Sequence, residues 1–410
     1  MQSLAKEISK KLGNFFLITK YSILNWVILM RYGKEDLQEI RDVLDCDEIA
    51  MCSFQNTKTK LFERKLEKYM SVEFAVAVSS GTAALHLALL SCGVGVGDEV
   101  LVDPLFEYGA LATLRCNAVP VFYDVNIDSY MPDVNNLINM ISPRTKAIII
   151  TNVFGCTADL PHIKGLCNKL NIKLIEDCSH AIMCKCHEKF AGTYGDIGVL
   201  SFHSSLHLSL GGGGMLMTSN ISLYKTILAL RDQKTHLLSW GYEISELISA
   251  IGITQLEKIG NVIHYCKTIG NWIGSNLQSP YIVAQKNEYS DHMFWRWAGR
   301  INDDELFKFL EKNFDNNYVT FGLNSKSIVN DSCIFKHLKR EDIYTCPYDC
   351  IFSRENCKEP IELINANAIA KHLLIIEIKF GTPLDKYKNM VQNIMEKINE
   401  FVSNKKCDCL

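Results

Sequence analysis

From about residue 73 the chain alternates short apolar runs with helical stretches, and this alternation restricts its possible folds more than any other feature. The first run, Phe74 to Val78, ends in a small polar turn, and a helical stretch from Ala83 to Leu90 follows at once. Further strand-like runs continue the pattern, at Glu99 to Val102, Val119 to Asp124, Ala147 to Asn152 and Lys173 to Glu176. Apolar strands that alternate with helices are typical of a doubly wound, largely parallel sheet.

The patterns on either side of this region predict three parts. Residues 1–70 are expected to form an N-terminal helical segment, and residues 71–270 a large α/β domain. From Ser222 the pattern becomes helical, and after about residue 277 it mixes strands and helices. We therefore expect a smaller C-terminal α+β domain over residues 271–410.

The overall composition excludes several classes of protein. Apolar residues make up 48% of the 410 residues and charged residues 22%, which is typical of a soluble globular protein. The net charge of −3 supplies no basic field for nucleic acid. Phe15 to Met30 is apolar but is interrupted by Lys20 and Asn25, and a membrane span needs ~20 clean residues. We expect a cytoplasmic protein, with an interfacial N-terminal helix as the alternative.

The turn after the first strand has the composition of an anion site. In Ser79-Ser80-Gly81-Thr82 a strand stops, a glycine permits a tight turn and a helix begins. The free N–H groups of a first helical turn and the positive end of the helix dipole attract phosphate. Without further motifs, a simple strand-to-helix turn explains the segment equally well.

Two later segments also place polar groups at strand ends. In Leu174-Ile175-Glu176-Asp177 an apolar strand ends in a carboxylate, where open α/β sheets collect their ligands. Such a carboxylate can pair with a cationic ring nitrogen of a cofactor, or it can cap a helix. The hydroxyls of Ser201, Ser204 and Ser205, followed by Gly211 to Gly214, suit either a loop around an anion or a glycine-rich hairpin.

Cysteine and histidine spacing does not predict a metal site. One stretch holds several potential ligands, namely Cys333, His337, Cys346, Cys350 and Cys357. Their spacings do not form a paired C-x-x-C site, and Cys184-Lys185-Cys186-His187 is equally unspecific. We expect these thiols to be buried or at the surface, without a metal.

Taken together in order and spacing, the motifs resemble the DegT–DnrJ–StrS sugar aminotransferases, which are fold-type I pyridoxal-phosphate enzymes. The resemblance covers roughly residues 50 to 270 and rests on SSGTAALHLAL, PLFEYGALAT, RTKAIIITNVFG, IEDCSHA, GDIGVLSFHSSLHLSLGGGGML and AIGITQLEKI. It implies a large doubly wound domain with a smaller C-terminal domain, assembled as a dimer. It also implies transamination of keto sugar nucleotides with pyridoxal phosphate or pyridoxamine phosphate as cofactor.

The resemblance assigns cofactor-binding roles to six positions, which are Gly81, Thr82, Tyr108, Asp177, His180 and Ser201. The first two and the serine would bind the cofactor phosphate. The tyrosine would stack on the pyridine ring, and the histidine would lie near the ring hydroxyl. The aspartate would keep the ring nitrogen protonated, so that the ring remains an electron sink.

The chain departs from the family pattern at the catalytic lysine. That lysine lies five residues after the serine, and the same count from Ser201 ends on Leu206. Leucine offers neither a nucleophile nor a base, so it can neither form the internal aldimine nor transfer the proton. The family's Gly-Glu-Gly-Gly also loses its glutamate at Gly212, and its Gly-Tyr-Asn segment reads Gly241-Tyr242-Glu243 without the arginine that follows. No catalytic residue is therefore intact, and any cofactor would be bound without a covalent bond.

Three functions stay open at this point. The first is a divergent sugar aminotransferase-like protein whose activity is impaired or lost. The second is a non-catalytic partner subunit of an active paralogue. The third is a histidine-based, pyridoxamine phosphate-dependent sugar 3-dehydrase, because one branch of the family has a histidine in the lysine's place. His207 is one position too late for that role, and in extended backbone it would point away from the cofactor.

Overall fold

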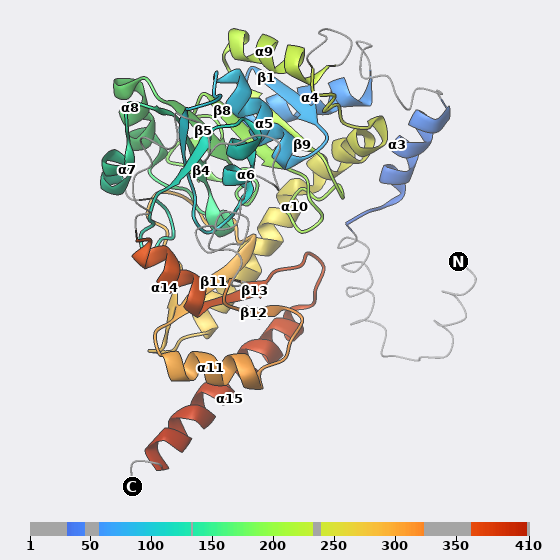
Figure 1. Ribbon diagram of the computed structural model, residues 1–410. Coiled ribbons are helices and arrows are strands. Elements are labelled where there is room, and N and C mark those ends of the chain that lie inside the picture. The colour runs from blue at the N-terminus through green and yellow to red at the C-terminus, as the bar shows by residue number, and fades with distance from the viewer. Residues whose placement is uncertain (1–30, 46–56, 133, 233–238, 324–361, 408–410) are drawn as a thin grey trace, which may run out of the picture.

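The structure, a computed structural model, describes residues 31–45, 57–132, 134–232, 239–323 and 362–407 (Figure 1). Its largest element is a seven-stranded sheet in the order β1-β9-β8-β5-β4-β2-β3. The strands are β1 (Phe74–Val78), β2 (Glu99–Val102), β3 (Val119–Phe122), β4 (Thr145–Thr151), β5 (Lys173–Asp177), β8 (Ile197–Ser201) and β9 (Gly214–Thr218). Pairs from β3 across to β8 are parallel, whereas β9 runs antiparallel to both of its neighbours. The predicted α/β fold class is thereby confirmed.

Helices cover both faces of this sheet. Those that contact its strands are α4 (Lys58–Met70), α5 (Gly81–Ser91), α6 (Tyr108–Arg115), α8 (Leu160–Leu170) and α9 (Ile221–Arg231). The same part of the chain also contains α3 (Lys34–Asp45), α7 (Val134–Met140) and α10 (Glu246–Asn276). Side chains alternate along β1, so that Ala75 and Ala77 belong to one buried cluster while Val76 and Val78 belong to the other. Burial on both faces is the reason that these strands read as continuous apolar runs.

A second sheet of four antiparallel strands follows in the C-terminal part, in the order β10-β11-β13-β12. These strands are β10 (Ile282–Ala284), β11 (Arg296–Ile301), β12 (Val319–Phe321) and β13 (Leu373–Glu377), and helices α11 (Asp304–Asn313), α14 (Ile364–His372) and α15 (Leu384–Cys407) accompany them. The predicted domain boundary at residue 270 falls inside α10, a 31-residue helix that reaches from the large sheet to the small one (Figure 1). Helices α3 and α4 pack against α10.

No helix among the described residues is long and apolar enough to cross a bilayer. The apolar stretch from Phe15 to Met30 lies outside those residues, as does the cysteine-containing stretch from Cys333 to Cys357. Within the described residues, no group of three or more histidine, cysteine or acidic side chains is arranged to hold a metal.

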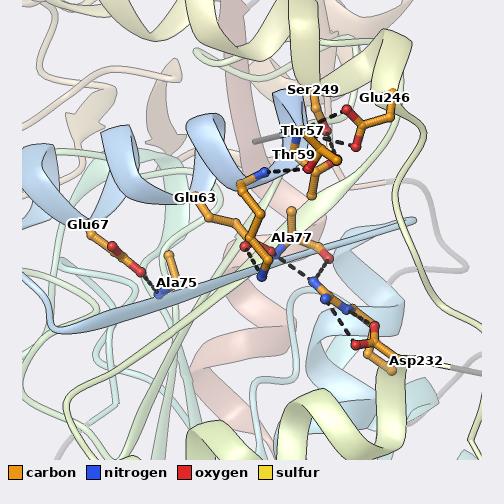
Figure 2. A network of polar contacts seen from close by, with 11 residues as sticks. Thr57, Thr59, Glu63, Glu67, Ala75, Ala77, Asp232, Glu246 and Ser249 are labelled. Atoms are coloured by element: carbon orange, nitrogen blue, oxygen red, sulfur yellow. Dashed lines mark hydrogen bonds and ion pairs between the residues drawn. The ribbon is translucent and has the colours of Figure 1, made fainter. Parts of the chain in front are cut away.

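Strand β1 lies at the edge of the large sheet, and two glutamates of α4 bind its free backbone groups. Glu67 accepts a hydrogen bond from the N–H of Ala75 at 3.0 Å, and Glu63 accepts one from the N–H of Ala77 at 2.9 Å (Figure 2). Arg231, at the end of α9, donates to the Glu63 carboxylate at 2.8 Å and to the carbonyl of Ala77 at 3.1 Å. An open strand edge is thus closed by side chains.

The Glu63–Arg231 pair is buried on both sides, since each side chain is at most 3% exposed. Burial on its own would lower the pKa of Arg231, but the charges of Glu63 and Asp232 outweigh burial and raise this pKa. Arg231 therefore stays ionised inside the protein. Asp232 also pairs with Arg231, and Lys60 also pairs with Glu63, so losing one member of the buried pair leaves the other only partly compensated.

We expect Glu63→Gln to lower the free energy of unfolding by about 3 kcal/mol, because it leaves the buried Arg231 with only Asp232 as a carboxylate partner. Urea unfolding followed by circular dichroism measures the change. The matched control is Glu257→Gln, which breaks the exposed ion pair with Lys65 and should cost less than about 1 kcal/mol. Equal losses in the two variants would contradict the structural role given to the buried pair.

Candidate cofactor site

A cavity of about 530 Å³ opens where β1, β5 and β8 end and α5 begins. The carboxyl ends of parallel strands are the ordinary ligand-binding edge of an open α/β sheet. The structure brings all six sequence-predicted residues to this cavity, namely Gly81, Thr82, Tyr108, Asp177, His180 and Ser201. Trp295 and Arg296 also line the cavity, and Arg296 is the first residue of β11 in the small sheet.

At one end of the cavity, backbone and small side chains pack unusually closely. Helix α5 begins at Gly81, and the Ser80 hydroxyl caps it by accepting a hydrogen bond from the N–H of Ala83 at 3.0 Å. A Cβ added at Gly81 would lie 2.5 Å from the Cβ of Ser201 and 2.8 Å from its Oγ. Only glycine permits this approach, which sets a serine hydroxyl directly beside the first turn of α5. A helix N-terminus and a hydroxyl at one point are suitable donors for a phosphate.

Asp177 is the last residue of β5 and is buried. Its Oδ1 accepts a hydrogen bond from the N–H of Ser179 at 3.0 Å, and no helix begins in the residues that follow. Helix capping therefore does not explain this carboxylate. Burial raises its pKa, while the hydrogen bonds from Ser179 oppose the rise. A cation in the cavity, such as a protonated ring nitrogen, would stabilise the charged form.

His180 is held between aromatic rings on the cavity wall. Its imidazole stacks on Trp295 with ring centroids 3.7 Å apart and planes inclined by 18°, and Phe106 meets it edge-on at 4.9 Å. The indole N–H of Trp295 donates to the carbonyl of Ser205 at 2.7 Å, which fixes the stack. Burial lowers the pKa of His180 well below its ordinary value, and the charge of Arg296 lowers it further. The imidazole is therefore neutral in this structure.

Tyr108 is the first residue of α6, and its side chain is 48% exposed. A half-exposed aromatic ring in a cavity wall leaves room for a planar ligand to stack on it. Burial raises the pKa of its hydroxyl, so the phenol is neutral.

Leu206 lines the same cavity and is 5% exposed. Its N–H donates to the carbonyl of His203 at 3.0 Å and so closes a turn. Arg31 holds this turn from outside, because its guanidinium donates to the carbonyl of Leu206 at 2.9 Å and also to that of His207. Among the described residues that line the cavity there is no lysine.

His207, the weak catalytic candidate from the sequence, is absent from the lining of this cavity. It contributes instead to a smaller cavity of about 250 Å³ on the other side of Leu206. Its Nε2 lies 3.1 Å from the carbonyl oxygen of Met293, and burial lowers its pKa to about 4. The backbone here forms a turn and not the extended strand expected from the sequence, and the imidazole of His207 does not line the candidate site.

Sequence reasoning missed several residues that line the cavity. His203 is exposed there, with its Nδ1 3.0 Å from the Oγ of Ser205. Trp295 and Arg296 lie at the start of β11, more than ninety residues after Ser201, the last of the six predicted residues. The only signal in that region was an aromatic-rich run around Trp295 and Trp297, which indicates a packed strand as readily as a site.

The segment Gly241-Tyr242-Glu243 is the one that departs from the family's Gly-Tyr-Asn pattern. Tyr242 lies against its own chain in the structure, where its carbonyl accepts from the N–H of Ser79 at 2.9 Å and its hydroxyl lies 3.2 Å from the Nδ1 of His86. The segment thus supports the β1–α5 turn from behind.

The seven-stranded sheet, its single reversed strand β9 and the cavity at the strand ends define the architecture of a fold-type I pyridoxal-phosphate transferase. Within that class the chain belongs to the DegT/DnrJ/EryC1/StrS aminotransferase family, whose model matches residues 31–345. The family resemblance inferred from the motifs is confirmed. The assignment of Leu206 to the lysine position stays a prediction.

Among curated relatives, the GDP-perosamine synthase of Vibrio cholerae is 30% identical over 295 residues, which cover 68% of this chain and 80% of that protein. The UDP-N-acetyl-3-dehydro-alpha-D-glucosamine 3-aminotransferase of Acidithiobacillus ferrooxidans is 38% identical over 263 residues, covering 61% of this chain and 70% of that protein. Both relatives are named for amino-sugar products or substrates that carry a nucleotide.

Solved structures share the fold at lower identity. An aminotransferase from Psychrobacter cryohalolentis is 19% identical with a TM-score of 0.72, covering 91% of this chain and 98% of its own. The E. coli GDP-4-keto-6-deoxy-D-mannose-3-dehydratase with bound hydrated PLP is also 19% identical, with a TM-score of 0.73 and coverage of 88% and 97%. The same fold therefore occurs in an aminotransferase and in a dehydratase.

We expect Gly81→Ala to lower the free energy of unfolding by about 1–3 kcal/mol, because the new methyl group would overlap Ser201. The double variant Gly81→Ala/Ser201→Gly removes the overlapping Cβ and should recover a large part of the loss. Thermal unfolding measures both changes.

Gly165→Ala is the matched control, since Gly165 also lies in a helix but a Cβ there would meet nothing within 4 Å. Alanine should stabilise that helix by up to ~1 kcal/mol. A Gly81→Ala variant as stable as the wild type would contradict the close packing described for the α5 N-terminus.

Proposed function

We propose that this chain is a divergent DegT-family protein that binds pyridoxal phosphate or pyridoxamine phosphate without a covalent bond. We further propose that on its own it is impaired in, or incapable of, the transamination of keto sugar nucleotides. One observation carries the proposal: a cavity that retains the six expected cofactor-facing residues has Leu206 in its wall and no lysine among its described lining residues.

The residues present suit the cofactor chemically. The α5 N-terminus with the Ser201 hydroxyl would hold the phosphate, and Asp177 would hold a proton on the ring nitrogen. Bound there, the cofactor would supply a cationic ring that withdraws electrons from a substrate carbon. Leu206 would add only apolar contact and exclude water, since it has no atom that can take up or release a proton.

The substrate class follows from the relatives. The two described above are named for GDP-linked and UDP-linked amino sugars, and this chain covers 80% and 70% of their lengths. A keto sugar nucleotide is therefore the substrate class that we propose for the cavity. We also propose a dimer located in the cytoplasm, formed with a second copy or with a paralogue.

Absorbance spectroscopy tests cofactor binding. The wild-type protein should bind added pyridoxal phosphate reversibly, and gel filtration in cofactor-free buffer should remove it. Leu206→Lys should retain a coloured adduct because it restores an amine inside the cavity. Borohydride reduction should then fix the cofactor on residue 206, as mass spectrometry would detect.

Ser204→Lys is the matched control, because residue 204 lies in the same turn but does not line the large cavity. It should yield no reducible adduct at that residue. A wild-type protein that binds neither pyridoxal phosphate nor pyridoxamine phosphate would sink the proposal, and robust transamination by the wild-type protein alone would overturn the claim about activity.

The combined departures at Leu206, Gly212 and Glu243 favour a partner-subunit role as the second candidate function. A chain that no longer performs chemistry could still complete the site of an active paralogue. Co-expression with a lysine-containing family member should then yield a mixed dimer during affinity purification. Exclusive recovery of homodimers would remove this candidate.

The histidine-based dehydrase requires an imidazole at the cofactor, and His207 lines only the smaller cavity. We therefore expect His207→Asn to leave both pyridoxamine phosphate binding and any deoxygenation of a 4-keto sugar nucleotide within about twofold of the wild type. His203→Asn is the comparison variant, since His203 does line the large cavity. Loss of deoxygenation in His207→Asn, but not in His203→Asn, would support the hypothesis of a dehydrase that uses His207.

A further inference from the structure

The cavity is also lined by a positively charged residue, Arg296, which is not among the six residues expected to bind the cofactor. Arg296 is the one lysine or arginine among the described residues that line the cavity. It begins β11, while the expected phosphate cradle lies at the start of α5 in the large sheet. The cofactor phosphate therefore does not account for Arg296.

The guanidinium is held rigidly in place. Its Cζ lies 4.2 Å from the centroid of Trp295, and Trp295 also carries the stacked imidazole of His180. One Nη atom donates to the Glu377 carboxylate at 3.1 Å. A planar cation stacked on indole and tied at one point is pre-organised, so ordering it on binding costs little.

Glu377 does not neutralise this cluster, because it serves two cations. Its other carboxylate oxygen lies 3.0 Å from the Nζ of Lys379. Two positive side chains and one negative side chain leave one positive charge uncompensated. Burial lowers the pKa of Arg296, whereas Glu377 opposes that shift, so the guanidinium is a partly desolvated cation that still has N–H groups to donate.

We propose that Arg296 is a substrate-binding residue that anchors an oxyanion of the substrate, in the part of the cavity lined by the start of β11. This inference rests on the proposed function. A bidentate guanidinium suits both a carboxylate and a phosphate. The group it holds is therefore either the diphosphate of a sugar nucleotide or the carboxylate of an amino donor.

Calorimetric titration of the full-length protein, saturated with pyridoxamine phosphate, distinguishes these sources. GDP serves as the diphosphate probe and L-glutamate as the carboxylate probe. Arg296→Gln should weaken the affinity for one of the two probes at least tenfold. Arg296→Lys should recover part of that affinity, because lysine keeps the positive charge but not the bidentate geometry of the guanidinium. The probe that is lost identifies the anion.

Lys379→Gln is the matched control for a general loss of positive charge. Lys379 pairs with the same carboxylate but does not line this cavity, so its removal should change the affinity for either probe by less than twofold. Equal weakening in Lys379→Gln and Arg296→Gln, unchanged affinity in Arg296→Gln, or no binding of either probe by the wild type would overturn the inference.

Pyridoxamine phosphate binding to each variant, followed by absorbance, separates this inference from the proposed function. Arg296→Gln should bind the cofactor as tightly as the wild type, which also demonstrates that the variant is folded. A wild-type protein that binds no cofactor would be a failure of the proposed function. Normal cofactor binding with a probe affinity that does not depend on Arg296 would be a failure of this inference alone.

Discussion

The contact between Gly81 and Ser201 is the constraint on which the candidate site depends. It brings the first turn of α5 against the end of β8, so that a helix N-terminus and a strand end from distant parts of the sequence meet without an intervening side chain. The surrounding structure maintains it: Gly213 donates to the carbonyl of Ser79 at 3.1 Å, and the α4 glutamates and Arg231 fix the edge of β1 from which the turn leaves. The packing of Gly81 against Ser201 therefore forms this end of the cavity without a bound ligand.

The sequence predicted the part of the site whose residues lie at the ends of strands. Such residues are found from a local pattern, since an apolar run that stops at Gly81 or Asp177 reports both the strand and its carboxyl end. Strand pairing then brought them together, as the family resemblance implied. The position of His207 depends on the turn that is closed by the hydrogen bond from Leu206 to His203. Side-chain periodicity alone does not predict such a turn.

The small-sheet wall could not be predicted in the same way. Trp295 and Arg296 are positioned by the pairing of β11 with β13 and by α10, which packs against α4 and also contacts β11; these are long-range contacts without a local motif. The residue-270 boundary also falls within a continuous helix, since an amphipathic pattern does not change where a helix passes from one sheet to another. Long-range contacts and domain boundaries are therefore harder to predict from the sequence than the ends of strands.

The residues that survive around Leu206 do not all carry the same weight as indications of a ligand. Gly81 is required by its packing against Ser201 whether or not anything binds, so its presence alone implies little. Asp177 and Arg296 differ, because each is an ionisable group whose charged form is disfavoured by burial and is stabilised only in part by its neighbours. In their ionised forms they would place opposite charges in one cavity, as the proposed pair of a cationic ring nitrogen and an oxyanion requires. Under the proposed function these are the two groups whose burial a bound ligand would compensate, whereas Gly81 needs no ligand to explain it.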